Sequence, residues 1–316
     1  SGNSEKNILC GYSFGFMLKE RMIPVGASEG VRIYCPSDGR FSFFNSPYPS
    51  HQAFTGVDVH PPVKFGDVAP TPIGGRVERI RRVKCPKGRG FEGSEVDYLL
   101  LLRSLENPKR MVKVLHVKPL VKCGETVRVG QELGTLIRSG YFDFWTDPHI
   151  HVEVRKPSDP LRARGGFRFK GLLRLGMKNV EPIEDLKGTV IESKPEYSLI
   201  SLGTEFKHGL PIELGGSFGI LDGGIPHYRW FGVYADRKPN LQEVVKLCGV
   251  PIGITKSVYG NLCLVKCNSI RFRLGETYVG LSLYLHPSSM PVVKIVPLKP
   301  KSLKTRVHES IRISIA

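Results

Sequence analysis

The chain has 316 residues, and its 46 Lys and Arg against 29 Asp and Glu give a formal net charge of +17. Domains usually run to about 100–200 residues, so this length accommodates about two domains with cores of their own. No apolar run reaches the roughly 18 residues of a membrane-spanning helix, so we expect no membrane span. The charge favours an acidic partner, but no zinc-finger, RNA-binding or helix-turn-helix pattern accompanies it. The sequence therefore favours a basic surface with another function over a dedicated nucleic-acid-binding protein.

Short strand signals between Gly and Pro turns predict a mainly β protein of antiparallel hairpins. Residues 1–44 are predicted to form an N-terminal extension, irregular with short strands, that packs on the first domain. Residues 45–157 are predicted to form that domain, a barrel-like antiparallel β fold. Its predicted strands lie at 55–59, 75–83, 96–103, 111–117, 126–129, 133–138 and 149–155.

The composition becomes basic and turn-rich after residue 157, which predicts a connector at 158–180. A second β-rich domain is predicted at 181–296, and a basic, loosely ordered tail at 297–316. One helix is predicted inside the second domain at 240–247, because Asn240 is a good cap and Gly249 a stop signal.

The seven cysteines are scattered and include no Cys-x-x-Cys pair. An odd number without paired spacing is typical of reduced thiols rather than of a disulfide framework. This pattern favours a reducing compartment and hence a cytoplasmic location. A leader removed before Ser1 would instead fit export.

Residues 148–155 read Pro-His-Ile-His-Val-Glu-Val-Arg, a strictly alternating stretch. Alternate side chains of a strand point to one face, so His149 and His151 share a face with Glu153 and Arg155. Two imidazoles about 7 Å apart on a strand can serve one metal site, one as ligand and one beside the bound water. An edge strand with two solvated histidines explains the alternation equally well.

Other candidate ligands lie in the same predicted domain, and a catalytic zinc site needs three of them. Asp58 and His60 alternate with two valines, so they share one strand face. His51 lies seven residues before Asp58 in a loop that contains Pro and Ser. His116 lies within the apolar strand predicted at 113–117, where a histidine is usually structural.

The order of these motifs resembles the core of the lysostaphin/LytM-type zinc endopeptidases. In that family a histidine such as His116 opens a segment, a glycine-bracketed hairpin like residues 124–134 follows, and a strand like Pro-His-Ile-His-Val-Glu closes the site. Upstream, residues 55–59 resemble the Gly-x-Asp strand of the family, and residues 70–77 resemble the turn after it. The resemblance covers 45–157 and implies a divergent peptidase-like domain with the duplicated hybrid motif.

The resemblance implies that Zn²⁺ is the cofactor and that Asp58 and His151 bind it. It implies that His116 and His149 are catalytic and flank the water that the metal activates. One imidazole would take the proton as general base, and Glu153 would orient an imidazole. The implied reaction is hydrolysis of a peptide or amide bond, with a cell-wall-like peptide as the usual substrate.

One ligand departs from the family pattern. The family has a histidine four residues before the aspartate, and here Phe54, which cannot bind zinc, takes that position. His51 is the best substitute, because the Ser- and Pro-rich segment 46–50 can fold it back onto the site. His60 is the alternative, because it shares the strand face of Asp58.

Two further groups of residues have a less specific interpretation. The loop 140–147 carries Tyr, Phe and Trp side chains, which either wall a substrate cleft or cap the edge of a core. The histidines outside the matched segment are predicted to be surface or core residues, with a satisfied polar tip for the one at 227. These are His208, His227, His286 and His308.

Two functions follow from these observations. The first is a zinc metallopeptidase-like hydrolase. The second is a non-catalytic relative that acts as a binding or regulatory module, including for an acidic polymer or nucleic acid. Phe54 and the reduced cysteines favour the second function. The joint presence of Asp58, His116, His149 and His151 favours the first, because a binding module has no need of all four.

Overall fold

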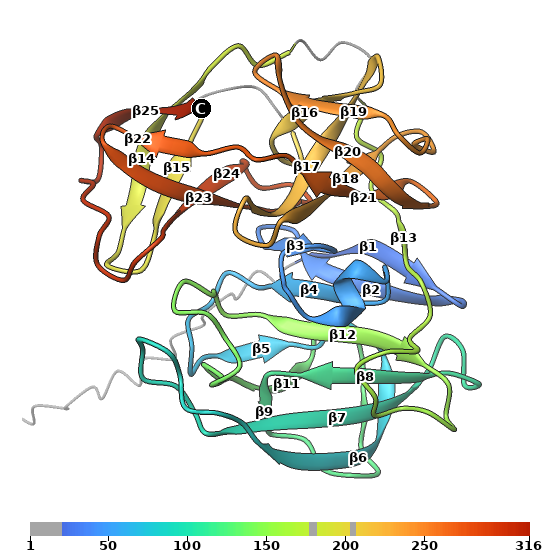
Figure 1. The fold of residues 1–316 in the computed structure, drawn as a ribbon. Coiled ribbons are helices and arrows are strands. Elements are labelled where there is room, and N and C mark those ends of the chain that lie inside the picture. The colour runs from blue at the N-terminus through green and yellow to red at the C-terminus, as the bar shows by residue number, and fades with distance from the viewer. Residues whose placement is uncertain (1–20, 177–181, 203–206) are drawn as a thin grey trace, which may run out of the picture.

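The computed structural model describes residues 21–176, 182–202 and 207–316 (Figure 1). The strands within these ranges pair antiparallel with their neighbours, so the predicted mainly β, antiparallel fold is confirmed. The start of the predicted N-terminal extension and the end of the predicted connector lie outside the described residues. Within the described ranges, no helix has the length and apolar character to cross a membrane.

The first region, residues 21–176, contains three sheets and one short helix, α1 (Pro49–Gln52). Its largest sheet has seven strands in the order β10-β6-β7-β8-β12-β4-β3. These strands are β3 (Arg40–Ser42), β4 (Val57–His60), β6 (Gly75–Lys84), β7 (Val96–Ser104), β8 (Met111–Leu115), β10 (Thr126–Val127) and β12 (Ile150–Arg155). The two three-stranded sheets comprise β1 (Met22–Ser28), β2 (Val31–Pro36) and β13 (Lys170–Gly171), and β5 (Val68–Pro70), β9 (Val117–Pro119) and β11 (Glu132–Leu136).

The strand β12 lies in the interior of the largest sheet, between β8 and β4. One face of β12, formed by Ile150, Val152 and Val154, lies in the apolar core with Val57 and Val59 of β4. The opposite face is also buried, histidines included. The alternative interpretation of an edge strand with solvated histidines is therefore wrong.

The second region, residues 182–202 and 207–316, forms a twelve-stranded sheet that closes on itself twice. The β16–β17 and β23–β24 pairings each close a ring of six strands, and the two rings are joined where β17 pairs with β23 (Figure 1). One ring contains β16 (Pro211–Leu214), β17 (Ser217–Ile225), β18 (Trp230–Ala235), β19 (Val244–Leu247), β20 (Val250–Tyr259) and β21 (Leu262–Cys267). The other contains β14 (Leu186–Ser193), β15 (Ser198–Ser201), β22 (Phe272–Leu274), β23 (Thr277–Leu283), β24 (Val292–Pro297) and β25 (Ser310–Ile315).

Two local predictions for this region are wrong. The helix predicted at 240–247 is absent, because Val244–Leu247 is the strand β19, which pairs with β16 and β20. Val245 and Leu247 are buried in the core and the residues between and before them are not, which is the alternation of a strand. The tail predicted to be loosely ordered contains β25, which pairs with β14 and β22 inside one of the rings.

The two regions share one packed interface. Ile220, Tyr234, Leu262 and Leu285 of the second region belong to the main core of the first. Phe41 of β3 exchanges both backbone hydrogen bonds with Leu285, N···O 2.8 Å in each direction. The second region is therefore bonded to the edge strand next to β4, the strand that carries Asp58.

Candidate metal centre and active site

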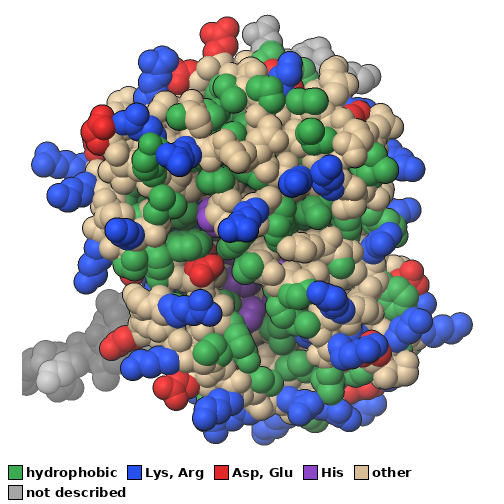
Figure 2. Space-filling view, in the orientation of Figure 1, with side chains coloured by type: hydrophobic (Ala, Val, Ile, Leu, Met, Phe, Trp, Pro, Cys, Tyr) green, Lys and Arg blue, Asp and Glu red, His purple; other side chains and the backbone are tan. Residues whose placement is uncertain are grey.

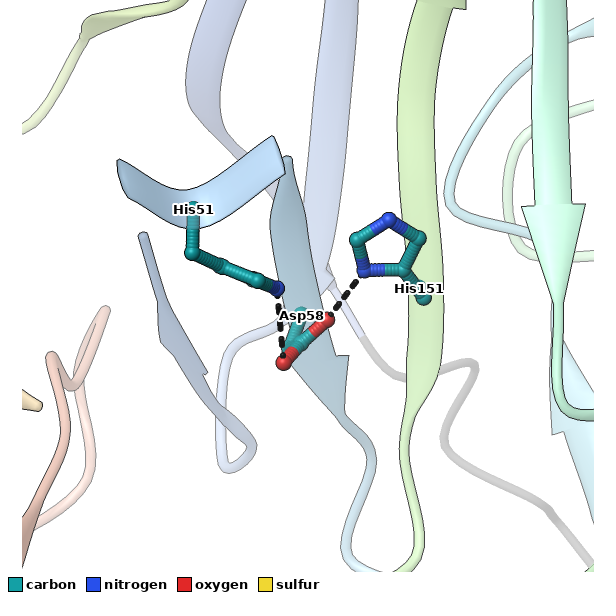
Figure 3. Close-up of side chains that lie close together, drawn as sticks. All are labelled: His51, Asp58 and His151. Atoms are coloured by element: carbon teal, nitrogen blue, oxygen red, sulfur yellow. Dashed lines mark hydrogen bonds and ion pairs between the residues drawn. The ribbon is translucent and has the colours of Figure 1, made fainter. Parts of the chain in front are cut away.

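His51, Asp58 and His151 meet in the buried interior of the first region (Figure 3). They come from α1, β4 and β12. One possible ligand atom from each lies within 4.8 Å of the others. Asp58 lies between the two histidines, with Oδ2 3.3 Å from His51 Nε2 and Oδ1 2.7 Å from His151 Nδ1. The structure thus brings together the three residues predicted as metal ligands.

The local fold explains why His51, and not the residue at position 54, reaches the site. Pro49 begins α1, and one helical turn places His51 toward Asp58. Phe54 follows with a left-handed φ of 63° and packs edge-on against Phe44, 5.5 Å between ring centroids. The aromatic side chain at the family's usual ligand position is therefore part of the core.

Close approach of α1 to β12 depends on Gly56. A Cβ at Gly56 would lie 2.5 Å from Ser50 Oγ and 2.8 Å from Cε1 of His151. Such contacts are too short for any side chain, so another residue at position 56 would push His151 and α1 apart. The cluster therefore requires glycine at position 56.

The orientation of His51 leaves an unsatisfied nitrogen in the cluster. Nδ1 donates to the carbonyl oxygen of Phe43 at 2.7 Å, because a carbonyl can only accept. Nε2 is buried, has no hydrogen-bond partner, and faces the carboxylate of Asp58. When the His51 ring is neutral, two electron-rich atoms face each other here, and a bound cation would stabilise both. A His-Asp-His donor set with an imidazole lone pair turned inward fits Zn²⁺.

His151 has a carboxylate at each ring nitrogen. Nδ1 bonds to Asp58 at 2.7 Å and Nε2 to Glu153 at 3.1 Å. Burial lowers the pKa of His151, but these two carboxylates outweigh burial and raise it to about 9. A cation at Nδ1 would replace one proton, and Glu153 would continue to hold the proton on Nε2.

Glu153 is itself fixed by two cations. It accepts from Lys113 Nζ at 2.8 Å and from Nη1 of Arg155 at 2.9 Å. Burial raises the pKa of Glu153, but the hydrogen bond and charge of His151, followed by those of Lys113, hold it below its usual value. The carboxylate that contacts His151 is therefore ionised and has a fixed orientation.

His149 lies beside the cluster and outside the ligand group. Nδ1 donates to the carbonyl oxygen of Asp147 at 2.9 Å, so the lone pair is on Nε2, which lies 4.0 Å from Asp58 Oδ2. Burial lowers the pKa of His149 to about 4, despite the nearby carboxylate. At neutral pH the side chain is a neutral imidazole with an accepting nitrogen beside the cluster.

His116 approaches His149 from the other side, with 4.9 Å between ring centroids. It does not lie within a strand as predicted. It occupies the break between β8 and β9 with a left-handed φ of 71°. Asp97 holds it there, accepting from the backbone N–H at 3.1 Å and pairing with Nδ1 at 2.7 Å.

The sequence analysis missed Asp97. The pairing with His116 lowers the pKa of Asp97 to about 2, even though burial raises it. The available signal was a single carboxylate in a strand that is otherwise apolar, Val-Asp-Tyr-Leu-Leu-Leu-Leu at 96–102. A carboxylate in such a strand needs a polar partner.

A cavity of about 550 Å³ opens onto the cluster between the two regions. Figure 2 shows histidine side chains in a hollow between the upper and lower halves of the molecule. The first region contributes aromatic walls, including Phe142, whose ring stacks on His149 at 4.8 Å. The other aromatic residues in the wall from this region are Tyr48, Tyr98, Tyr141 and Trp145. The loop 140–147 thus forms part of a cleft wall.

The second region also lines this cavity. Its contributions are Tyr228, Ser282, Tyr284 and Lys294. The buried Lys294 ammonium lies 2.8 Å from Asp147, and Arg40 contacts the same carboxylate at 2.6 Å. These cations hold the pKa of Asp147 well below its usual range. The second region thereby fixes the residue whose carbonyl orients His149.

The remaining histidines lie outside the ligand group. His60, the alternative third ligand, lines the cavity, but its Nδ1 bonds to the carbonyl of Pro148 at 3.1 Å. The prediction that the polar tip of His227 is satisfied by hydrogen bonds is wrong, because both of its ring nitrogens are buried without a hydrogen-bond partner. His286 is buried and bonded to Ser289 Oγ at 3.1 Å, whereas His308 is exposed.

Known proteins resemble parts of this chain. A family model described as the N-terminal domain of a domain of unknown function (DUF8155) matches residues 32–171, less than half of the chain. Two curated isoleucine–tRNA ligases match over 171 residues, 51% of this chain but only 17% of their own length. They come from Ralstonia pickettii (26% identity) and Cupriavidus taiwanensis (25%).

Two solved peptidase structures are also similar. The catalytic domain of the prophage-encoded M23 protein EnpA from Enterococcus faecalis is 20% identical, covering 36% of this chain and 72% of that domain, with a TM-score of 0.24. Lysostaphin is 13% identical, covering 87% of this chain and 96% of its own, with a TM-score of 0.27. Both TM-scores are low, so these similarities carry no argument about the function of this chain.

Proposed function

We propose that this chain is a zinc-dependent, LytM-like hydrolase that cleaves a peptide or amide bond. The observation that carries the proposal is the cluster of His51, Asp58 and His151, in which a buried imidazole nitrogen without a hydrogen bond lies 3.3 Å from the shared carboxylate. Apolar residues at these positions would give a more stable fold than these buried polar groups, unless a cation binds between them. A protein that only binds a partner has no need of it.

Each polar group around the cluster has a chemical role in this proposal. Zinc, held by His51, Asp58 and His151, would supply a Lewis acid and lower the pKa of a water molecule. His149, neutral at physiological pH, accepts a proton at Nε2 as the general base. His116, held at Nδ1 by the Asp97 carboxylate, would act as an imidazolium ion and donate from Nε2 to the oxygen that becomes negative during attack.

The cavity determines which molecules can react. Aromatic side chains of the first region and residues of the second region line the cavity around the histidines, so a substrate that reaches them would lie between the two regions. We therefore propose a peptide as the substrate, held between the two regions.

Zinc content tests the proposal. Protein purified without added metal should contain about one zinc ion per chain, measured by elemental analysis. His151→Ala should lose that zinc, because it removes one of three ligands. His308→Ala, which removes an exposed histidine elsewhere, should retain it. Wild-type protein that contains no zinc, and that added zinc does not stabilise, would show the proposal to be wrong.

A specific surface favours the second candidate function, binding of an acidic polymer. β6 exposes a row of basic side chains, and Arg79, Arg81, Arg82 and Lys84 form none of the ion pairs among the described residues. Release of counterions makes such binding depend steeply on salt. We expect affinity for a heparin column to fall sharply between 50 mM and 200 mM salt, and Arg81→Ser/Arg82→Ser to weaken retention. Retention that is flat with salt would contradict this surface.

A further inference from the structure

The buried carboxylate of Asp222 belongs to the second region but contacts the first. It lies in β17 where this strand passes from one ring to the other. Asp222 pairs with Gly232 of β18, and the next residue, Gly223, pairs with Leu283 of β23. Asp222 is fully buried and does not line the cavity. A charged side chain in this position needs partners, and it finds them across the interface.

The partners of Asp222 form one turn of the first region, residues 42–45. Oδ1 accepts from the hydroxyl of Ser42, and Oδ2 accepts from the backbone N–H of Phe43 at 2.7 Å. The Ser42 hydroxyl oxygen in turn accepts from the backbone N–H groups of Phe44 at 3.0 Å and Asn45 at 2.7 Å. The Asp222 carboxylate thus accepts from two donors of this turn and, through Ser42 Oγ, is linked to two further backbone N–H groups.

Two glycines of the second region leave the space that this turn occupies. A Cβ at Gly232 would lie 1.9 Å from the ring of Phe44, and a Cβ at Gly223 would lie 3.0 Å from the Phe44 carbonyl oxygen. Gly223 also has a φ of +124°, which side chains rarely adopt. The turn therefore packs closely against the second region, where only glycine fits at these two positions.

The residue held by Asp222 is the same residue that orients His51. The N–H of Phe43 donates to Asp222, and the carbonyl of Phe43 accepts from His51 Nδ1 at 2.7 Å. This second bond fixes the tautomer of His51 and turns Nε2 toward Asp58. A continuous chain of short hydrogen bonds therefore runs from the second region to the metal cluster.

We propose that Asp222 is a positioning residue for the metal ligand His51, so that docking of the second region completes the metal centre. This inference rests on the proposed zinc site. Burial raises the pKa of Asp222 to about 7, and in its ionised form the carboxylate suits the role because it only accepts hydrogen bonds. The lone pairs of Ser42 Oγ are already used by two N–H groups, so an amide at position 222 would direct its NH₂ at another donor in either orientation.

Zinc affinity measured by competition with a chelator tests this inference. We expect Asp222→Asn to weaken zinc binding about tenfold, the lower end of the range for residues that orient a ligand. Tyr234→Phe is the matched control, because it removes one buried hydrogen bond between the regions, to the carbonyl of Leu173 at 2.8 Å. It should bind zinc as tightly as wild type, because it leaves the Asp222 contacts in place.

A spectroscopic readout separates positioning from loss of stability. The visible spectrum of the cobalt-substituted protein should change in Asp222→Asn and stay unchanged in Tyr234→Phe. Ser42→Ala serves if Asp222→Asn does not fold, and it should weaken zinc binding more than the control. Equal zinc affinities for wild type and the folded Asp222 or Ser42 variant would overturn the inference while leaving the proposed function intact. A wild-type protein without zinc affinity would instead overturn the proposed function.

Discussion

Replacing His149 by alanine should lower kcat for peptide hydrolysis by about 10²–10⁴, while the variant retains its zinc. His149 is not among the three residues whose ligand atoms converge. Its accepting nitrogen lies 4.0 Å from the Asp58 carboxylate, beside the position where the cation would be bound. Loss of the imidazole removes the general base and leaves the three ligands in place. Release of new amino groups from a peptide pool measures the rate, and elemental analysis measures the zinc.

Two other variants make this prediction specific. His51→Ala should lose both zinc and activity, because the missing group is a ligand. Asp97→Asn should retain zinc and lose part of the activity, because it weakens the bond that orients His116. Zinc lost from the His149 variant would make His149 a ligand and contradict the assignment. An unchanged kcat in the His149 variant would show that His149 is not the general base.

The local pattern was sufficient to predict much of the candidate site. Alternation placed Asp58 on one face of its strand, and His149 and His151 on one face of theirs. Antiparallel pairing of β4 with β12 sets His151 opposite Asp58, so these residues lie on the same side of the sheet. Period-two patterns carry this information because a buried strand has only two faces. The third candidate ligand was less certain, because a loop residue has no such constraint.

Tertiary contacts decided what the sequence left open. His51 reaches the cluster because Phe54 adopts a positive φ and the Phe43 carbonyl lies where Nδ1 can bond to it. Neither feature has a local sequence signal. The roles of Asp97 and Asp222 were likewise out of reach, because each carboxylate contacts residues far away in the chain.

The wrong helix at 240–247 shows the same limit. A segment of eight residues has little helical stability of its own, and its two adjacent valines pack well in a sheet. Pairing with two neighbouring strands decided the outcome.

The free energy of unfolding should fall steeply as the pH is lowered from about 6.5 to about 4. Burial lowers the pKa of four histidines: His149 to about 4, His227 and His286 to about 3, and His60 well below its usual value. In this window the unfolded chain binds protons at these four histidines that the folded protein does not. Burial raises the pKa of one carboxyl, Asp222, to about 7, which opposes the effect at a single site, so the net result is that stability is lost as the pH falls. Each histidine contributes a slope of up to about 1.4 kcal/mol per pH unit. Urea unfolding at a series of pH values measures the slope.

His227→Phe isolates one of these contributions. The imidazole of His227 packs among aromatic rings, 5.5 Å from Trp145 and 4.4 Å from Tyr228, and both ring nitrogens lack partners. The variant should reduce the acid slope by up to about 1.4 kcal/mol per pH unit and raise stability, because it removes unsatisfied polar atoms from the core. His308→Phe, at an exposed position, should leave the slope unaltered, because the side chain of His308 is not buried. If His227→Phe and wild type lose stability equally between pH 6.5 and 4, the histidine at 227 is not held neutral by burial.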